Sequence, residues 1–208
     1  MKKVVFLSIL LVLVLSFSAF AAGGLAGKKI YVDPGHGGTD GGAVGPTGLK
    51  EADVNLRVGT VLKNCLIEYG GATVRMSRTG NTTLSLSYRT TDANNWGAHR
   101  FISVHHNAAS DRSVNGTETY CYGSGSSNSF DLRNKVHAQL IAWGGLNNRG
   151  VKTANFYVLV NTNMPAILTE ASFISNAAEE ARLRDANYTW RQGYYIYRGV
   201  CDHYGVSY

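Results

Sequence analysis

Residues 29–38 read Lys-Ile-Tyr-Val-Asp-Pro-Gly-His-Gly-Gly, and this stretch predicts a strand that runs directly into a tight loop. Aromatic and β-branched side chains favour a strand over residues 29–33, and the proline and glycines that follow end it. Asp33 and His36 therefore stand at or just past the end of a strand, where open α/β sheets place their functional sites. The stretch indicates both a sheet and the edge of that sheet at which chemistry is expected.

The rest of the chain alternates strand-like and helix-like segments. We expect strands at residues 29–33, 73–78, 101–106, 116–122, 156–160 and 166–172. We expect helices at residues 51–69, 85–95, 132–143, 177–183 and 188–204. This alternation, without an internal repeat or a low-complexity linker, predicts one layered α/β domain over residues 28–208. Its sheet should be mixed but mostly parallel, with helices on both faces.

The first residues have the features of a secretory signal peptide. Two lysines precede an apolar stretch at residues 4–15, and Ala19-Phe20-Ala21 fits the small-x-small pattern of a cleavage site. The apolar stretch is shorter than the roughly 20 residues that a membrane span needs. We therefore expect a signal peptide at residues 1–21 and a flexible lead-in at residues 22–27. The protein should be secreted or periplasmic, at the cell envelope, with no transmembrane segment after signal removal.

The charge of the chain limits its partners. The formal net charge is +6, and removal of the two lysines of the signal peptide gives 6 − 2 = +4. A modest positive charge suits an anionic surface such as a bacterial envelope. No dense run of lysine and arginine with interleaved aromatic residues occurs, so we expect no nucleic-acid partner. The sequence indicates no particular protein partner and no oligomeric state.

Cysteine usage and glycine spacing exclude some cofactors. Outside the cell, Cys65, Cys121 and Cys201 could form one disulfide and leave one thiol, and three buried free thiols are an equal alternative. None of them has Cys-x-x-Cys spacing, which disfavours a thiolate metal site. The Gly-rich loop after residue 34 lacks the spacing of phosphate-binding and dinucleotide-binding loops, so we expect no nucleotide cofactor.

Two further strand ends carry chemistry-bearing side chains. His105 and Glu170 each end an apolar strand, and Glu51 opens the first helical pattern, where the helix dipole favours an ionised carboxylate. Taken singly, each of these residues and His36 has an ordinary explanation, such as surface charge or a salt bridge. Taken together, two histidines and two glutamates match the requirements of a catalytic zinc ion with its own general base.

Alternation along the strand at residues 101–106 separates its two histidines. His105 and Asn107 share one side of the strand, and His106 lies on the other, where we expect it to pack in the core. Asp33 is placed to accept an N–H from a ligating histidine. Asn107 is placed to contact the substrate or support the site. We interpret three other histidines as surface or satisfied structural residues, namely His99, His137 and His203.

Several motifs occur in a fixed order along the chain. They are Val-Asp-Pro-Gly-His-Gly-Gly at 32–38, Gly-Leu-Lys-Glu-Ala-Asp-Val-Asn-Leu at 48–56, Ser-Arg at 77–78, Leu-x-x-Arg at 86–89, Phe-Ile-Ser-Val-His-His-Asn-Ala at 101–108, and Pro-Ala-Ile-Leu-Thr-Glu-Ala-Ser-Phe-Ile-Ser-Asn at 165–176. Over nearly the whole mature chain, this order resembles the zinc-dependent N-acetylmuramoyl-L-alanine amidases of the cell-separation and sporulation type.

The resemblance implies a site and a reaction. His36, Glu51 and His105 would bind one Zn²⁺, and Glu170 would be the catalytic glutamate. The substrate would be peptidoglycan, and a zinc-activated water would cleave the amide between N-acetylmuramic acid and L-alanine. Ala171 departs from the glycine that is usual in the family and would narrow the pocket slightly. Residues 123–129 are too short for the helix that plugs the zinc site in some relatives, so we expect an open cleft.

Two other functions are compatible with these residues. Another zinc-dependent wall peptidase would use the same metal chemistry and cut a different bond. A catalytically silent wall-binding module would keep the fold alone, and the complete set of ligands together with Glu170 argues against it. The sequence does not say whether the wall is the cell's own or a competitor's, nor in which process it is cut.

Overall fold

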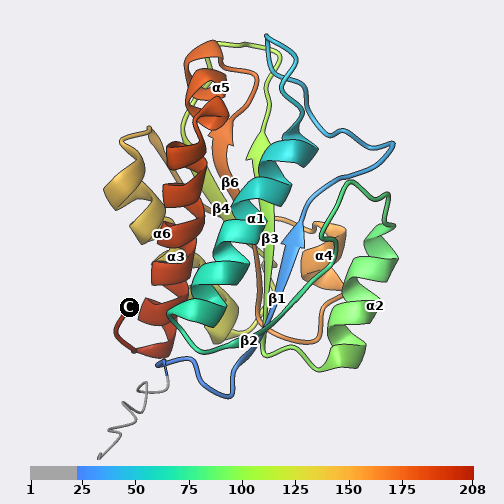
Figure 1. Ribbon diagram of the computed structural model, residues 1–208, viewed down its shortest axis with the longest axis vertical. Coiled ribbons are helices and arrows are strands. Elements are labelled where there is room, and N and C mark those ends of the chain that lie inside the picture. The colour runs from blue at the N-terminus through green and yellow to red at the C-terminus, as the bar shows by residue number, and fades with distance from the viewer. Residues whose placement is uncertain (1–22) are drawn as a thin grey trace, which may run out of the picture.

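The computed structural model describes residues 23–208, so the signal peptide expected at residues 1–21 lies outside the described residues. In chain order the elements are β1 (Lys29–Pro34), α1 (Glu51–Glu68), β2 (Thr73–Met76), α2 (Leu86–Trp96), β3 (Arg100–Asn107), β4 (Thr117–Cys121), α3 (Ser127–Gly144), β5 (Asn148–Thr153), α4 (Tyr157–Val160), β6 (Ala166–Phe173), α5 (Ala177–Arg184) and α6 (Ala186–Tyr204). They form one central sheet with helices packed around it (Figure 1).

The sheet has six strands in the order β2-β1-β3-β6-β4-β5. The pairs β1–β2, β1–β3, β3–β6 and β4–β5 are parallel, and only β4–β6 is antiparallel. The prediction of a mixed, mostly parallel sheet is therefore confirmed. Because β1, β3 and β6 are neighbours that run in the same direction, their carboxyl ends meet at one edge of the sheet.

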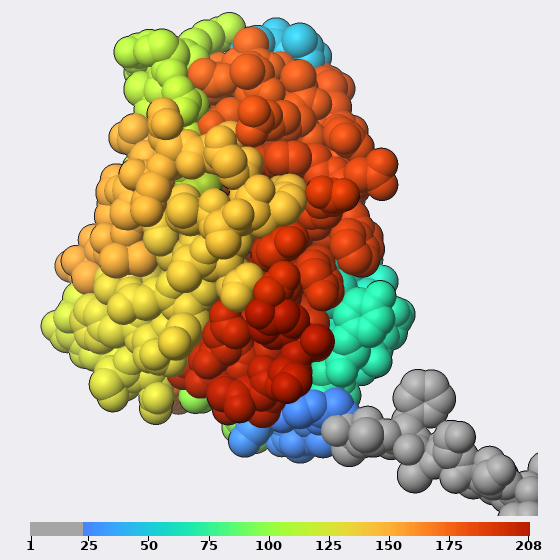
Figure 2. Space-filling model, turned by 90° about the vertical axis from the view of Figure 1, so that its left-hand side faces the viewer, coloured from blue at the N-terminus to red at the C-terminus, as the bar shows by residue number. Residues whose placement is uncertain are grey.

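Helices cover both faces of the sheet, as predicted. Helices α1, α3 and α6 bury the larger apolar cluster against one face, and α2 and α4 bury a smaller cluster against the other. Helix α1 contributes Val54, Val58 and Leu62, which recur at helical spacing and are fully buried. On the face seen in Figure 2, α3 and α6 lie side by side.

Helix ends follow the expected capping chemistry. Ser85 accepts a hydrogen bond from the backbone N–H of Tyr88 at the start of α2, and Gly97 ends that helix in the left-handed conformation with a φ of 69°. Ser126 and Asp185 cap α3 and α6 in the same way. These caps fix where α2, α3 and α6 begin.

The strand expected at residues 156–160 is wrong, because this segment forms the short helix α4. Val158 and Leu159 are both 4% exposed and both lie in the smaller apolar cluster. Successive residues of a strand point to opposite faces, whereas one helical turn allows these two neighbours to be buried together. Burial on this face therefore overrides the β propensity of the sequence.

The strand β5 was missed by the sequence pattern. Val151 is the one apolar side chain in Asn148–Thr153, and most residues of this strand are exposed. It is an edge strand that pairs only with β4, so it needs no alternating apolar face.

The flexible lead-in expected at residues 22–27 is also wrong for its described part. Leu25 is fully buried in the larger core cluster, and its backbone N–H donates to the Gly70 carbonyl at 2.8 Å. Residues 23–27 therefore belong to the folded domain.

The described residues settle two further points. Cys65, Cys121 and Cys201 are all buried and free, which is the second of the two alternatives for the cysteines. Within residues 23–208, no helix combines the length and the apolar character that crossing a membrane would require.

Candidate metal centre and catalytic cleft

Three side chains from separate elements meet at the carboxyl edge of the sheet. His36 lies in the loop after β1, Glu51 is the first residue of α1, and His105 lies near the end of β3. Each offers one ligand atom, and these three atoms lie within 4.8 Å of one another. Among residues 23–208, this is the one such group of histidine, cysteine, aspartate and glutamate side chains.

Glu51 stands at the centre of this group. Its Oε1 lies 2.9 Å from His105 Nδ1, and its Oε2 lies 3.2 Å from His36 Nε2. Backbone N–H groups also donate to the carboxylate, from Ala43 at 2.9 Å and from His106 at 3.2 Å. Burial by itself would raise the pKa of Glu51, but the contacts with both imidazoles lower it below its ordinary value. The carboxylate is therefore ionised and able to bind a cation.

His36 is held in an unusual conformation. Its φ of 60° lies in the left-handed region, which costs a non-glycine residue on the order of 1–3 kcal/mol. Asp40 faces the Nδ1 atom of His36 at 2.8 Å, so Nε2 points at Glu51. Although burial would lower the pKa of His36, the carboxylates of Glu51 and Asp40 raise it to about 9. The two carboxylates therefore favour a positive charge at this position.

The structure corrects the role expected of Asp33. Its Oδ1 accepts from the Arg89 guanidinium at 2.7 Å and its Oδ2 accepts from the Ser103 hydroxyl at 2.9 Å, so it does not orient a ligating histidine. Asp40 takes that place beside His36. Asp40 follows His36 by four residues in the same loop, and this spacing is the signal that sequence reasoning overlooked.

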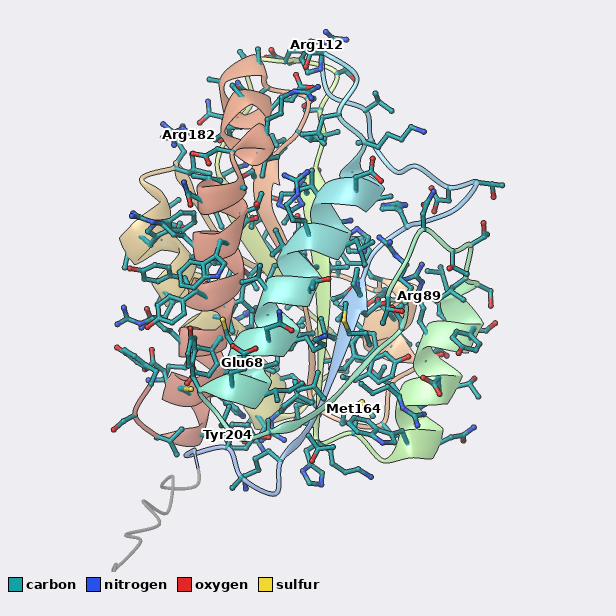
Figure 3. All side chains as sticks on the ribbon, viewed as in Figure 1. Glu68, Arg89, Arg112, Met164, Arg182 and Tyr204 are labelled. Atoms are coloured by element: carbon teal, nitrogen blue, oxygen red, sulfur yellow. The ribbon has the colours of Figure 1, made fainter. Side chains whose placement is uncertain are left out.

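Two buried arginines hold the loop that carries His36. Arg89 donates to the carbonyls of Pro34 and His36, both at 2.8 Å, and Figure 3 shows it between α2 and β1. Arg78 donates to the carbonyl of Pro34 at 3.0 Å and to that of Gly35 at 2.8 Å. A guanidinium group presents several N–H donors in a fixed plane. It can therefore donate to the carbonyls of an irregular loop that have no hydrogen-bond partner in the sheet.

At two positions of this loop, the ligand side chains lie so close to the backbone that only glycine fits. A Cβ atom on Gly35 would lie 2.1 Å from the His105 ring. A Cβ on Gly42, whose φ is 66°, would lie 2.7 Å from Glu51 Oε2 and 2.8 Å from His36 Cδ2. The glycines of this loop therefore leave room for the cluster of ligand atoms.

Glu170 faces the same cluster from β6, paired in register with His105 across β3–β6. Its Oε2 is buried and has no hydrogen-bond partner among the described residues. Burial, together with the nearby carboxylates of Glu51 and Glu118, raises the pKa of Glu170 well above its ordinary value. A carboxyl group that takes up a proton this readily has the property expected of a general acid and base.

Glu118 is another buried glutamate beside this site, and the sequence reasoning missed it. It pairs in register with Glu170 across β4–β6 and is 2% exposed. Its carboxylate accepts from Arg149 and Lys152, each at 2.6 Å, from the Tyr120 hydroxyl at 2.5 Å, and from Asn107 Nδ2 at 3.1 Å. The sequence does contain a signal that could have located Glu118, because it is a charged residue in the middle of a short predicted strand.

These contacts also decide the place of Asn107. Its amide N–H is engaged by Glu118, and its Oδ1 accepts from the backbone N–H of Ala108 at 2.8 Å. Asn107 does not line the cleft that contains the ligand cluster. Its expected contact with the substrate is therefore not supported, and it supports Glu118 instead.

The remaining histidines are placed as the sequence predicted. His106 is buried in the core, where burial lowers its pKa to about 4. His137 lies between Thr119 and Asn148, and His203 faces Asp131. None of them joins the ligand cluster.

The cluster opens into a cleft of about 620 Å³. Its lining includes His36, His105 and Glu170, together with a group of apolar and aromatic side chains that we call the apolar wall. The apolar wall consists of Leu84, Leu86, Phe156, Tyr157, Val158 and Leu168. The loops that follow β3 and β4, residues 108–116 and 122–126, contain no helix. A cleft with one apolar wall and a few convergent polar groups is typical of a substrate site.

A second hollow, of about 510 Å³, lies between the end of α3 and the start of α6. Trp143, Tyr188 and Trp190 line it, and Asp185 is the one carboxylate at its edge. Because Asp185 caps α6 by accepting from the backbone N–H of Asn187 at 2.8 Å, it is already engaged. The arrangement offers no group for catalysis, so the cleft at the sheet edge is the candidate active site.

Comparison with known proteins agrees with this geometry. The profile of a protein family described as N-acetylmuramoyl-L-alanine amidase matches residues 30–202. The chain is 40% identical over 159 residues to the N-acetylmuramoyl-L-alanine amidase CwlM of Bacillus licheniformis, covering 76% of this chain and 61% of that protein. It is 38% identical over 161 residues to the sporulation-specific N-acetylmuramoyl-L-alanine amidase of Bacillus subtilis, covering 77% and 62%. The chain thus spans about three fifths of the length of these curated relatives.

A solved structure shares the fold. The catalytic domain of CwlV, an N-acetylmuramoyl-L-alanine amidase from Bacillus (Paenibacillus) polymyxa, superimposes with a TM-score of 0.82 at 34% identity. The match covers 86% of this chain and 99% of that domain. The elements that bring the three ligand atoms together are therefore part of a fold shared with a known amidase domain.

Proposed function

The chain belongs to the family of N-acetylmuramoyl-L-alanine amidases, and from that premise we propose that it is a zinc-dependent peptidoglycan hydrolase. Its reaction is hydrolysis of the amide that joins N-acetylmuramic acid to the L-alanine of the stem peptide. The observation that carries this proposal is the convergence of His36, Glu51 and His105 beside Glu170, whose Oε2 has no partner among the described residues.

The donor set fits zinc. Two imidazole nitrogens and one ionised carboxylate are ligands that zinc prefers, and three protein ligands leave a position for water or substrate. The three ligand atoms, one from each residue, lie within 4.8 Å of one another, so a single ion could contact all three. When bound there, zinc supplies Lewis-acid polarisation of the scissile carbonyl and lowers the pKa of a water molecule.

Glu170 moves the protons of the reaction. Its carboxylate accepts the proton that the attacking water releases, and the same carboxyl group then donates a proton to the departing nitrogen of L-alanine. Its raised pKa suits both steps, because a carboxyl group that titrates nearer to neutral pH exchanges protons in both directions. Glu118 cannot substitute for it, since its oxygens are occupied by four donors.

The apolar wall of the cleft binds the substrate beside the reacting bond. Phe156 and Tyr157 are 39% and 43% exposed, and Leu86 is 53% exposed, although all three line the cleft. Exposed aromatic and aliphatic side chains at a cleft mark a binding surface. We propose that this wall contacts the apolar ring faces and the methyl groups of the amino sugar.

The proposal includes export. Residues 1–21 act as the signal peptide, and the mature protein works at the cell envelope, where its substrate is found. N-terminal sequencing of the protein from culture fluid or periplasm tests this, and we expect the mature chain to begin just after Ala21.

Digestion of purified peptidoglycan with product identification tests the activity. We expect mass spectrometry to find released peptides that begin with L-alanine, together with intact glycan strands. A chelator should abolish the release and zinc should restore it. Peptides cut at another bond would instead identify a wall peptidase, and wall binding without any cleavage would identify a silent binding module. Either result contradicts the proposal.

A further inference from the structure

A chain of buried polar side chains connects α6 to the metal centre. It runs from Gln192 on α6 through His106 on β3 and Asn55 on α1 to Glu51. Gln192 and His106 are 1% exposed, Asn55 is fully buried and Glu51 is 4% exposed. Buried polar groups are costly unless they are hydrogen-bonded, so the four residues constrain one another.

The direction of the hydrogen bonds can be worked out from the Glu51 end. The Asn55 Nδ2 atom lies 3.2 Å from Glu51 Oε1 and 3.3 Å from the carbonyl oxygen of Gly35. An ionised carboxylate and a carbonyl can only accept, so the amide N–H groups of Asn55 must point to them. Asn55 therefore presents its Oδ1 to the next member of the chain.

His106 must then donate to Asn55. Its Nδ1 lies 2.7 Å from Asn55 Oδ1, which has no proton to give. The ring contacts amide groups on both sides and has no carboxylate partner, so a buried imidazolium would be uncompensated and the ring is neutral. A neutral imidazole with its proton on Nδ1 has an acceptor at Nε2.

Gln192 completes the chain as a donor. Its terminal amide lies against His106 Nε2, with Oε1 at 2.9 Å, while its Nε2 is buried and has no partner among the described residues. Two acceptors cannot share a contact. Rotation of the amide by half a turn exchanges its oxygen and nitrogen, places an N–H against His106, and removes the conflict.

We infer that Gln192 is a positioning residue for the metal centre. Its N–H donates to His106 Nε2, the Nδ1–H of His106 donates to Asn55 Oδ1, and the N–H of Asn55 donates to Glu51 Oε1. All three bonds point toward the ligating carboxylate, and bonds aligned in this way polarise one another. This inference rests on the proposed function, because it assumes that Glu51 binds the metal.

A substitution at Gln192 separates this role from simple packing. Gln192→Met keeps the volume and removes the donor, and we expect the zinc dissociation constant to rise about tenfold, at the lower end of what hydrogen-bond partners of ligands contribute. If only volume mattered, Gln192→Met would keep the zinc dissociation constant of the wild-type protein.

A control on the same helix is available. Thr189 is fully buried, and its hydroxyl donates only to carbonyls of its own turn. Thr189→Val therefore removes a buried polar group of α6 that does not reach the centre. We expect its zinc dissociation constant to stay within twofold of wild type, as measured by competition with a chromophoric chelator.

Nitrogen NMR of the histidine rings in the wild-type protein provides an independent readout. We expect His106, identified by the signals that vanish in His106→Gln, to carry its proton on Nδ1. A proton on Nε2, or a zinc affinity in Gln192→Met within twofold of wild type, would overturn the inference. Neither measurement uses peptidoglycan, so a wild-type protein that binds zinc but releases no peptides would overturn the proposed function alone.

Discussion

Glu118 and Glu170 face each other across neighbouring strands, yet their surroundings differ in almost every respect. The two residues are paired in register between β4 and β6. Glu118 accepts hydrogen bonds from two cationic side chains, a tyrosine and an asparagine. Glu170 has a buried oxygen without any partner among the described residues. The same side chain is therefore fully compensated on one strand and left uncompensated on the next.

The difference appears in the proton affinity of the two groups. Burial raises the pKa of Glu118, but the bonds from Lys152, Tyr120 and Arg149 outweigh it and lower the pKa below its ordinary value. Glu170 has no such donors, and burial with two neighbouring carboxylates raises its pKa. Reactivity at this edge of the sheet thus follows from burial without hydrogen-bond donors and not from residue type alone.

Glu170→Gln tests the reactive member of the pair and should have the largest effect. We expect the turnover of peptidoglycan to fall by about 10²–10⁴-fold, because the proton transfers lose their general acid and base. Zinc binding should stay within about twofold of wild type, since Glu170 lies outside the ligand cluster. Release of L-alanine-terminated peptides and zinc affinity measure the two halves separately. Turnover within threefold of wild type would show that Glu170 is not the proton-transfer group.

Glu118→Gln tests the compensated member. We expect the metal-free protein to lose about 2 kcal/mol of unfolding free energy, since hydrogen bonds to charged groups contribute about 1.5–3 kcal/mol each and the freed cations can reach water. Glu170→Gln should instead gain about 1 kcal/mol, because a neutral amide is cheaper to bury than an unpartnered carboxylate. Urea denaturation with a chelator present measures both, and changes of the same sign would break the comparison.

The sequence predicted which side chains gather at this edge of the sheet, but it did not predict which hydrogen-bond donors surround each of them. His36, Glu51, His105 and Glu170 could be located because each stands where a strand or helix begins or ends, and periodicity reports those positions. The layered fold was predictable for the same reason. The partners of Glu118 come from β3, β4 and β5, and which donors surround a buried group depends on strand order, which periodicity does not contain.

Two wrong predictions, the role of Asp33 and the strand at residues 156–160, have a common physical cause. Asp33 was assigned to a histidine from proximity in sequence, but Arg89, located 56 residues later, reaches its carboxylate first. The segment at residues 156–160 has strand propensity, and only packing against the second face of the sheet makes it a helix. In each case a contact between distant segments decides a local outcome, and local pattern cannot foresee it.

The pH dependence of stability sharpens the comparison, because the two glutamates have opposite signs. The folded-state pKa of Glu118 lies below the ordinary value of 4.5, so its contribution is present above that pH and is lost as the pH falls through the folded-state pKa. The pKa of Glu170 is raised, so its contribution is full below about pH 4.5 and is lost as the pH rises through the folded-state pKa.

Two unfolding series with a chelator present check these signs. We expect the advantage of Glu170→Gln over wild type to shrink as the pH falls from neutral toward 4.5. The deficit of Glu118→Gln should persist down to about pH 4.5 and shrink only at lower pH. Parallel curves for wild type and both variants would mean that neither group has a shifted pKa.

Tyr120 connects the two regions and should give the smallest effect. Its hydroxyl donates to Glu118 Oε2, and its ring packs edge-to-face on Phe156, at 5.2 Å between centroids, where Phe156 lines the cleft. Tyr120→Phe removes the hydroxyl and keeps the ring. We expect a loss of about 1 kcal/mol in unfolding free energy, because Asn107 still donates to the same oxygen, and a turnover within twofold of wild type.

Tyr120→Ala is the matched variant, because it removes the ring as well. Phe156 then loses its support, and we expect the KM for peptidoglycan to rise severalfold while kcat changes little, as binding to the apolar wall weakens. If Tyr120→Phe alone slowed turnover as strongly as Glu170→Gln, the hydroxyl would have to take part in proton transfer. The cage around Glu118 would then belong to the catalytic machinery, and the division between a compensated and a reactive carboxylate would be wrong.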